Sequence, residues 1–297
     1  MARQSQGVHR AVAGRGLQYA LTALAVAVSL SGGSVTGLSL PSRPESLKFA
    51  VLGDFGDGDQ PEYDVAAQMA RVRERFPFEF VITTGDNFLG SQEDPHHLAE
   101  KFERPFAPLL QAGVRFYASL GNHDKPSISQ YPLFNMSGRQ YYTFARKNVR
   151  FFVLDTNYYD RRQAAWLEEA LRSSQDDWKI CYFHHPLYSN GSSHGPEIEL
   201  RILLEPLFAR YGVDVVFSGH EHVYERLTPQ KGIQYFVNGS GGQAIGKIEP
   251  GGSTVAAYAD DQSFMMAEVI GHDLYFETVS RTGATVDGGV FRRPPRN

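Results

Sequence analysis

Apolar runs that end in glycine and a polar side chain recur along the chain, and they constrain its fold more than any other feature. Three of these runs, at 47–53, 78–85 and 114–121, predict buried strands. Amphipathic stretches at 63–76 and 98–113 predict helices between them, the second helix broken by prolines. This β-α-β-α-β order predicts parallel strands joined by right-handed crossovers.

The second half of the chain adds two helices and more strands. Two β-rich runs around Lys147 and Asn148 predict a hairpin over 140–156. Helices are expected at 161–174 and 196–212. Further strands are expected at 178–185, 213–219, 232–240, 263–271, 273–280 and 284–291.

Elements of this kind predict an α/β (α+β) fold in which two mixed sheets face each other between outer helices, a four-layer α-β-β-α sandwich. The 297 residues suffice for one such domain. Neither an internal repeat nor a second linker divides the chain. We therefore expect one domain over residues 46–297.

Residues 1–45 do not have the pattern of a domain. Three arginines precede an apolar run at 17–30, and small residues and prolines follow it. This order is typical of an export signal, and the run of about 14 residues is shorter than the roughly 20 that span a bilayer. We expect a signal peptide and linker on a secreted or periplasmic protein, without stable membrane insertion after signal removal. A retained membrane anchor is the less favoured alternative.

The charge and the cysteine content exclude some partners and covalent cross-links. The net charge is −4 and no basic cluster follows the first residues, so a nucleic-acid partner is not expected. Cys181 is the only cysteine, which excludes an intramolecular disulfide. It lies in an apolar run and is expected to be a small buried side chain. The sequence leaves the oligomeric state open.

Polar side chains gather where five of the predicted strands end. The segments are Gly53–Gly56, Gly85–Phe88, Gly121–Asp124, Phe183–Pro186 and Gly219–His222. Each segment alone is more commonly a turn. Because strand ends in open α/β sheets converge on one crevice, we expect the five to share a site. Their aspartate, asparagine and histidine side chains suit two adjacent metal ions about 3.5–4 Å apart.

The ordered series GDFG, GDNF, GNHD, FHHP and GHEH resembles the calcineurin-like metallophosphoesterase superfamily over about 46–290. Within it, GDNF, HGP at 194–196, FHHPLY and GHEHVYER are most similar to the small, tartrate-resistant-type purple acid phosphatases. The resemblance implies a small-molecule phosphate ester as substrate. It also implies two metal ions (Fe, Mn or Zn) and no other cofactor.

The resemblance further implies a set of metal ligands. They are Asp54, Asp86, Asn122, His184, His220 and His222. Asp86 would bridge the two ions, and Asp54 and His222 would bind the first ion only. The other three would bind the second. A metal-bound hydroxide would then be available for in-line attack, because two cations neutralise the phosphoryl oxygens and lower the pKa of a bound water.

Three more residues receive catalytic roles from the resemblance. His123 would protonate the leaving alkoxide, an effect typically worth roughly 10²–10⁴-fold in rate. Asp124 would orient the His123 imidazole and fix its tautomer. His194 would lie in the substrate pocket. His185 should point away from its neighbour on a strand, so we expect a packing or rim residue there.

Two positions depart from the families that the chain resembles. Purple acid phosphatases carry a tyrosine three residues after the bridging aspartate, and its phenolate binds ferric iron and gives the colour; here that residue is Leu89. Many other members carry a histidine two residues after the first aspartate; here that residue is Gly56. The first ion keeps only Asp54, Asp86 and His222, so a divalent ion and a colourless protein are expected.

An exported binuclear phosphomonoesterase, similar to the acid phosphatases, is the favoured interpretation. A phosphodiesterase acting on nucleotides or lipid head groups would use the same metal chemistry. A catalytically weakened phosphate- or ligand-binding protein is the third alternative, motivated by the incomplete set of ligands for the first ion. One ion per chain and unchanged behaviour of Asp54→Ala would favour that alternative.

Overall fold

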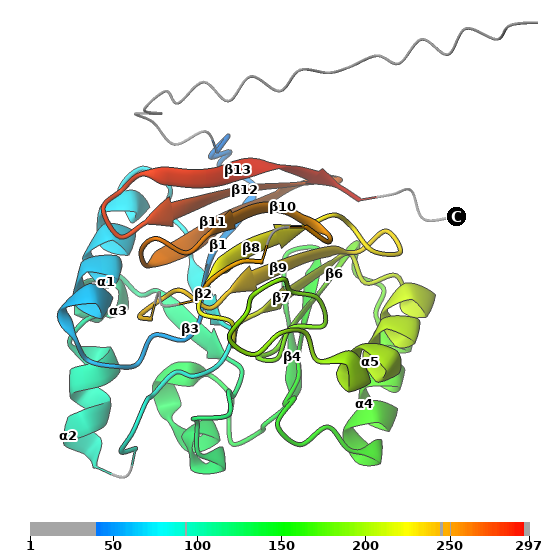
Figure 1. The fold of residues 1–297 in the computed structure, drawn as a ribbon, viewed down its shortest axis with the longest axis horizontal. Coiled ribbons are helices and arrows are strands. Elements are labelled where there is room, and N and C mark those ends of the chain that lie inside the picture. Colours follow the sequence, from blue (N-terminus) through cyan, green and yellow to red (C-terminus); the bar gives the residue numbers. More distant parts are fainter. Residues whose placement is uncertain (1–39, 93, 244–245, 250, 294–297) are drawn as a thin grey trace, which may run out of the picture. The chain divides into compact units, whose positions relative to one another are not determined.

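Two mixed β-sheets lie face to face between outer helices in the computed structural model of the chain (Figure 1). The structure describes residues 40–92, 94–243, 246–249 and 251–293. The predicted four-layer α-β-β-α sandwich is confirmed. The apolar run expected to be an export signal lies outside the described residues.

The first sheet has six strands in the order β13-β12-β11-β1-β2-β3. They are β1 (Leu47–Leu52), β2 (Phe80–Thr83), β3 (Arg115–Ala118), β11 (Ser263–Ile270), β12 (Asp273–Ser280) and β13 (Thr285–Arg292). β1, β2 and β3 pair in parallel, as their alternation with helices predicts. β11 joins β1 antiparallel, so the C-terminal strands extend the same sheet.

The second sheet has seven strands in the order β10-β8-β9-β7-β6-β5-β4. They are β4 (Tyr142–Arg146), β5 (Val149–Val153), β6 (Trp178–Tyr182), β7 (Val215–Ser218), β8 (Tyr224–Leu227), β9 (Gln234–Asn238) and β10 (Thr254–Tyr258). The expected β4–β5 hairpin is present, and β5, β6, β7 and β9 are parallel. β8 and β10 were not predicted, because YERL mixes charged and apolar residues and TVAAY is a short edge strand without alternation of polar and apolar residues.

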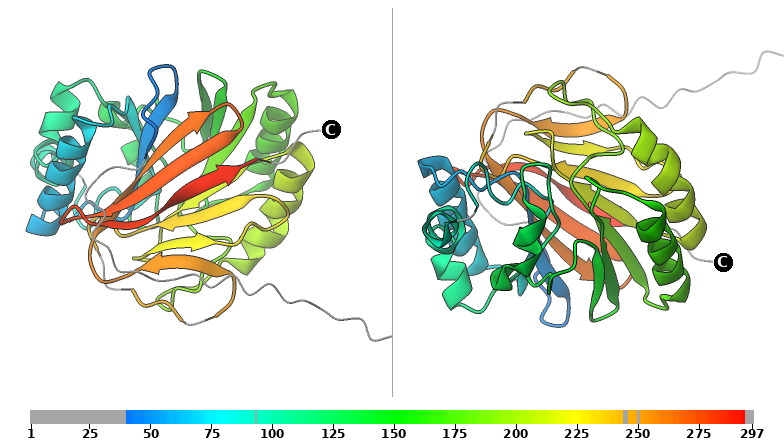
Figure 2. Two further views of the ribbon diagram at one scale, coloured as in Figure 1. Left: turned by 90° about the horizontal axis from the view of Figure 1, so that it is seen from above. Right: turned by 90° about the horizontal axis from the view of Figure 1, so that it is seen from below.

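Helices cover the outer face of each sheet (Figure 2). On the first sheet lie α1 (Gln60–Arg73), α2 (Pro95–Leu98), the π-helical turn η1 (Ala99–Glu103) and α3 (Ala107–Gln111); on the second lie α4 (Arg161–Ser173) and α5 (Ile198–Tyr211). Two 3₁₀ turns follow β3: η2 (Pro126–Gln130) and η3 (Pro132–Phe134). α1 begins before its predicted start because the Asp59 carboxylate caps the helix at the N–H of Glu62. No helix in the described ranges has the length and apolarity needed to cross a bilayer.

Aromatic side chains join the two sheets in the core. Phe49 of β1 packs edge-on against Phe151 of β5 and Phe217 of β7, with ring centroids 5.4 and 6.2 Å apart. Phe80 of β2 packs edge-on against the same Phe151 at 5.5 Å. Edge-to-face pairs at these distances are favourable beyond the area they bury. The packing therefore fixes the strands of one sheet relative to those of the other.

Part of the expected linker is bound to the domain. The backbone N–H groups of Ser42 and Arg43 donate to the Glu268 carboxylate at 2.7 and 2.6 Å. The Ser46 hydroxyl donates to the same carboxylate, which is fully buried. Residues 42–46 therefore pack as part of the sandwich rather than as a free connection.

Candidate metal centre and adjoining cavity

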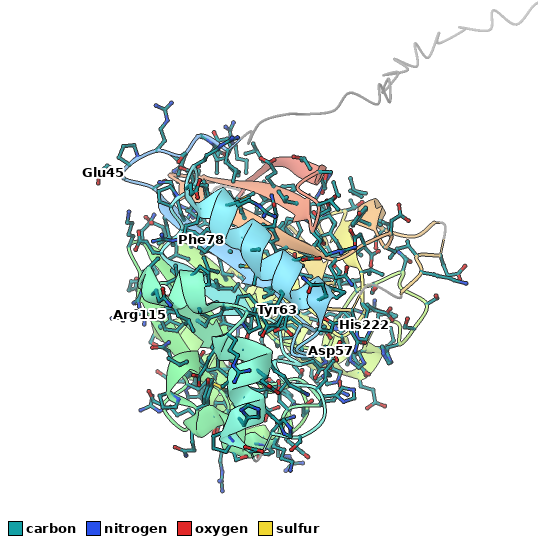
Figure 3. The ribbon with its side chains drawn as sticks, turned by 90° about the vertical axis from the view of Figure 1, so that its left-hand side faces the viewer. Glu45, Asp57, Tyr63, Phe78, Arg115 and His222 are labelled. Atoms are coloured by element: carbon teal, nitrogen blue, oxygen red, sulfur yellow. The ribbon has the colours of Figure 1, made fainter. Side chains whose placement is uncertain are left out.

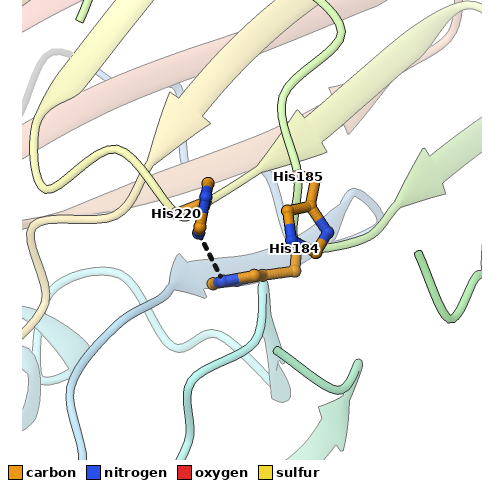
Figure 4. Close-up of side chains that lie close together, drawn as sticks. All are labelled: His184, His185 and His220. Atoms are coloured by element: carbon orange, nitrogen blue, oxygen red, sulfur yellow. Dashed lines mark hydrogen bonds between the residues drawn. The ribbon is translucent and has the colours of Figure 1, made fainter. Parts of the chain in front are cut away.

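The five polar segments directly follow β1, β2, β3, β6 and β7, and side chains from four of them meet at one point. His184 Nε2 lies 2.9 Å from Asn122 Oδ1 and 3.4 Å from Asp86 Oδ2. His220 Nδ1 lies 3.1 Å from the same His184 nitrogen, the contact dashed in Figure 4. Three potential metal donors from three other loops therefore converge on His184 Nε2.

A second group lies on the side of β1. His222 Nε2 is 3.7 Å from Asp54 Oδ1, and the backbone N–H of His220 donates to Asp54 Oδ2 at 3.1 Å. Figure 3 labels His222 and Asp57 toward the same end of the molecule, away from Glu45 and Phe78. The loops after β1 and β7 are thus joined through the Asp54 carboxylate.

Backbone geometry turns these side chains inward. Asp54, Asp86 and His220 have φ values of 56°, 48° and 69°, in the left-handed region that costs a non-glycine residue about 1–2 kcal/mol. Such conformations gather at functional sites. Gly121 permits the close approach of Asp86, because a Cβ at position 121 would lie 2.1 Å from Asp86 Oδ1. The turns therefore hold strained backbone where the candidate ligands lie.

The buried His184 is the centre of the electrostatics. Its Nδ1 lies 2.9 Å from the carbonyl oxygen of Thr84, so Nδ1–H donates there and Nε2 faces the other donors. Burial opposes a charge on this ring, yet Asp54 and Asp86 raise the pKa of His184 to about 9. Burial likewise opposes the Asp86 carboxylate, but its hydrogen bond with His184 holds the pKa of Asp86 at about 2. A cation bound at Nε2 would displace the proton of this ion pair.

The neighbouring groups also fit metal binding. Burial lowers the pKa of His220 and of His222, and the positive charges of nearby histidines add to the effect. Neutral imidazoles are the form that binds metals. Burial raises the pKa of Asp54 well above its usual range, and the Asp86 charge contributes. Buried carboxylates with neutral imidazoles are a donor set that divalent cations balance.

Two trios of described side chains have donor atoms within 4.8 Å of one another. One is Asp54, Asp86 and His184; the other is His184, His185 and His220. His184 belongs to both. Both trios are candidate cation sites, since carboxylate and imidazole donors are the kinds that divalent transition metals bind.

His185 lies beside this group, and the expectation that it points away is wrong. β6 ends at Tyr182, so the alternation of a strand does not extend to His185. The His185 ring is centred 5.0 Å from that of His184 and 4.6 Å from that of His220 (Figure 4). Its Nδ1 lies 2.8 Å from the Thr156 hydroxyl. His185 thus occupies the rim of the site with its ring toward the candidate ligands.

Asp124 does not make the expected contact with the His123 imidazole. Its buried carboxylate accepts hydrogen bonds from the backbone N–H groups of Asn87 and Phe88 at 3.0 and 3.1 Å and from the Asn87 side chain at 2.7 Å. Burial raises the pKa of Asp124 to about 6, and the Asp86 charge contributes. Asp124 therefore fastens the loop after β3 to the turn that carries Asp86.

His123 and His194 both lie beside the candidate ligands. The backbone N–H of His123 donates to Asp86 Oδ1 at 2.8 Å. The His194 ring stacks on His220 with centroids 4.1 Å apart and planes at 28°. It is also 6.2 Å from the ring of His222. The structure thus brings together residues whose sequence positions are distant.

Glu221 holds the loop that carries His194, a role that the sequence did not reveal. Its carboxylate is fully buried. The backbone N–H groups of Ser193, His194 and Gly195 donate to it. A carboxylate that accepts several N–H groups fixes the backbone around it. The acidic residue between the histidines of GHEH is the only sequence signal for this contact.

A cavity of about 510 Å³ opens beside Asn122 and His185. Its wall continues over residues 156–159, which follow β5, and over residues 197–203 at the start of α5. The volume lies within the range of small-molecule sites. The candidate metal centre therefore adjoins a space large enough for part of a substrate.

Known proteins share this sequence pattern and fold. The sequence profile of the calcineurin-like phosphoesterase family matches residues 47–224. Purple acid phosphatase 17 of Arabidopsis thaliana is 29% identical over 86% of this chain and 89% of its own length. Tartrate-resistant acid phosphatase type 5 of Mus musculus is 26% identical over 66% and 72%. The structure of purple acid phosphatase PPD1 from yellow lupin (Lupinus luteus) seeds has a TM-score of 0.71 at 19% identity, covering 86% of this chain and 55% of that chain, which supports the fold.

Proposed function

Since the chain belongs to the calcineurin-like phosphoesterase family and is a hydrolase of phosphate esters, we propose that it is an exported phosphomonoesterase with a binuclear metal centre. The convergence of Asp86, Asn122 and His220 on His184 Nε2 carries this proposal. The resemblance to acid phosphatases and the position of His194 support the preference for monoesters.

We assign the metal ligands by motif and by proximity. Asp86 would be shared by the two ions, Asp54 and His222 would hold the first ion, and Asn122, His184 and His220 would hold the second. Two bound cations neutralise phosphoryl oxygens and supply Lewis acidity. The hydrogen bond from His184 Nδ1 to Thr84 orients its ring for this task.

The remaining residues act on the substrate. The backbone N–H of His123 is hydrogen-bonded to Asp86. The His123 imidazole donates a proton to the ester oxygen while the bond between that oxygen and phosphorus breaks and an oxygen from water bonds to phosphorus. His194 donates to a terminal phosphoryl oxygen. Because its ring stacks on His220 at 4.1 Å, we place it against the phosphoryl group, where it would crowd a second ester substituent. This crowding favours monoesters.

Phenyl phosphate and methyl phenyl phosphate test the proposal, because both release the same phenolate. We expect the metal-loaded protein to hydrolyse the monoester much faster. Asp86→Ala should abolish turnover and His123→Ala should lower it by roughly 10²–10⁴-fold, whereas Arg172→Ala on the exposed surface of α4 should change it little. Faster hydrolysis of the diester would favour the phosphodiesterase alternative. Phosphate binding without turnover of either ester would favour the binding protein.

Export is tested separately from catalysis. The proposal rests on the basic start and the apolar run 17–30. We expect the protein recovered outside the cytoplasm to begin after residue 30 when its N-terminus is sequenced. A full-length, membrane-associated chain would instead favour the retained anchor.

A further inference from the structure

The cavity beside the histidines begins at the candidate ligands and has a fixed wall. Asn122, which lines it, lies 2.9 Å from His184 Nε2. The Thr156 hydroxyl is 2.8 Å from His185 Nδ1, and Asn157 donates from its side chain to the backbone of the loop after β3 at 2.9 Å. A group attached to a phosphate held at the ligands would therefore extend along this wall.

Apolar side chains are concentrated around the cavity. Four of the six exposed large apolar residues in the described part of the chain lie on the two wall segments: Tyr158 is 70% exposed, Ile198 44%, Ile202 67% and Leu203 54%. Tyr158 and Leu203 line the cavity itself, together with Leu200. Exposed apolar groups that line a cavity, as Tyr158 and Leu203 do, mark a binding surface, whereas Ile198 and Ile202 lie outside the lining.

The charged side chains that line the cavity are all acidic, whereas Arg201 of the same segment of α5 lies over the Tyr188 ring and outside the lining. Asp124, Glu197 and Glu199 line the cavity, and its described lining contains no lysine or arginine. Two other cavities in the described part of the chain differ, since Arg139 lines one, and Arg115 and Arg146 line the other. A negatively charged wall disfavours ligands that carry further negative charge.

From these features we propose that the cavity is the subsite for the leaving alcohol, and that it selects phosphate monoesters of apolar alcohols without a second negative charge. This inference rests on the proposed function. Tyr158, Leu200 and Leu203 contact the alkyl or aryl group. Glu197 and Glu199 discriminate against polyphosphates, bisphosphates and carboxylated esters.

A series of n-alkyl phosphates from ethyl to octyl tests the apolar contact, because the basicity of the leaving alcohol is nearly constant along it. We expect kcat/KM to rise about two- to fourfold per methylene until the cavity is filled. Leu203→Gln and Tyr158→Ser should flatten this rise. Ile202→Gln is the matched control: a change to the same residue at the preceding position of α5, which does not line the cavity, should preserve the rise.

Charge is tested with two esters, 3-phosphoglycerate, whose alcohol carries a carboxylate, and glycerol 3-phosphate, whose alcohol is uncharged. Glu199→Lys should raise relative kcat/KM for the carboxylated ester severalfold at low ionic strength, and less at high salt. Glu74→Lys, which makes the same change at an exposed residue after α1, should leave the ratio unchanged. An unchanged ratio in Glu199→Lys would contradict the proposed discrimination.

Binding of n-alkylphosphonates, measured by calorimetry on the metal-loaded protein, separates this inference from the proposed function. If no monoester is hydrolysed, the proposed function fails, and the chain-length dependence of phosphonate affinity still decides the role of the cavity. A flat dependence in the wild type overturns the subsite. A dependence lost equally in Leu203→Gln and Ile202→Gln also overturns it, since the outer surface rather than the cavity would then bind the chain.

Discussion

The backbone N–H of Leu89 donates a hydrogen bond to the carbonyl oxygen of Gly56 at 2.9 Å. This bond joins the two positions at which related enzymes carry an extra ligand for the first metal. A Cβ at position 56 would lie 2.0 Å from the carbonyl oxygen of Asn87, next to Asp86. The pairing of the two turns thus excludes a histidine at position 56, while Leu89 remains only partly buried.

Leu89→Tyr should create a phenolate ligand for the first metal. After loading with ferric iron, we expect this variant to gain a visible tyrosinate-to-iron absorption band, because a hard anionic oxygen donor favours Fe(III). Wild type and Leu89→Phe should lack the band. A band in the wild-type protein would contradict our account of this position.

Gly56→Ala should destabilise the protein, because the added methyl group overlaps backbone atoms that cannot move independently. We expect a loss of about 1–3 kcal/mol in the free energy of unfolding, measured with urea. Gly113→Ala is the comparison: nothing lies within 4 Å of its added Cβ, so only its φ of 78° imposes a cost. Equal losses of unfolding free energy in the two variants would contradict this prediction, because the overlap at position 56 would then cost nothing.

Asp124 should make the stability of the metal-free protein depend on pH. Burial raises its pKa to about 6, so folding favours the protonated carboxyl. The stabilisation is complete below the unfolded pKa of about 4 and is lost as pH rises through 6, by at most about 3 kcal/mol. We expect Asp124→Asn to lack this part of the pH dependence when both proteins are unfolded with urea from pH 4 to 7.

Metal loading provides the control for Asp124, because nearby cations favour its ionised form. The difference in pH dependence between wild type and Asp124→Asn should shrink in the metal-loaded proteins. If the free energy of unfolding depends on pH identically in the two metal-free proteins, this part of the pH dependence does not come from Asp124.

Glu221→Gln should disturb His194 without removing the metals. A carboxamide offers only one acceptor oxygen, and its NH₂ group would face the N–H donors of residues 193–195. The unpaired N–H groups should lower the free energy of unfolding by about 1–3 kcal/mol. We expect KM to rise while two metal ions per chain remain. In a double-mutant cycle, His194→Ala should add little to the effect on KM. Loss of a metal ion would instead show that Glu221 supports the ligands directly.

Metal binding should release a proton from His184 at neutral pH. The carboxylates around it raise its pKa to about 9, so the metal-free ring is protonated below that pH. Metal affinity should therefore increase with pH up to about 9. Calorimetry in buffers of different ionisation enthalpy measures the released protons, and His184→Ala should release fewer. A heat of binding independent of the buffer would contradict the prediction.

Local sequence patterns were sufficient for much of the fold. The strands β1, β2 and β3 and the helices between them follow from hydrophobic periodicity, which depends on neighbouring residues only. β8 was missed because its sequence, YERL, combines charged and apolar residues, and its burial comes from pairing with β9 and β10. β10 is an edge strand, and polar and apolar residues do not alternate along its sequence, TVAAY.

The same distinction applies to the site. The sequence predicted the segments, the donor types and the membership of a phosphoesterase family, since each motif is contiguous. It did not predict that Glu221 binds the His194 loop or that His185 turns toward His220. It also misassigned the partner of Asp124. Each of these contacts joins two loops that follow different strands and are distant in the sequence.

The sequence by itself determined which chemical groups stand at the strand ends, because glycine, aspartate and histidine follow apolar runs in a fixed order. Only the tertiary structure decided how those groups pair. His184 meets Thr84 across 100 residues of chain, and Asp54 meets His220 across 166. Such contacts depend on how two sheets pack face to face, and packing energy is shared among many side chains rather than encoded in one motif.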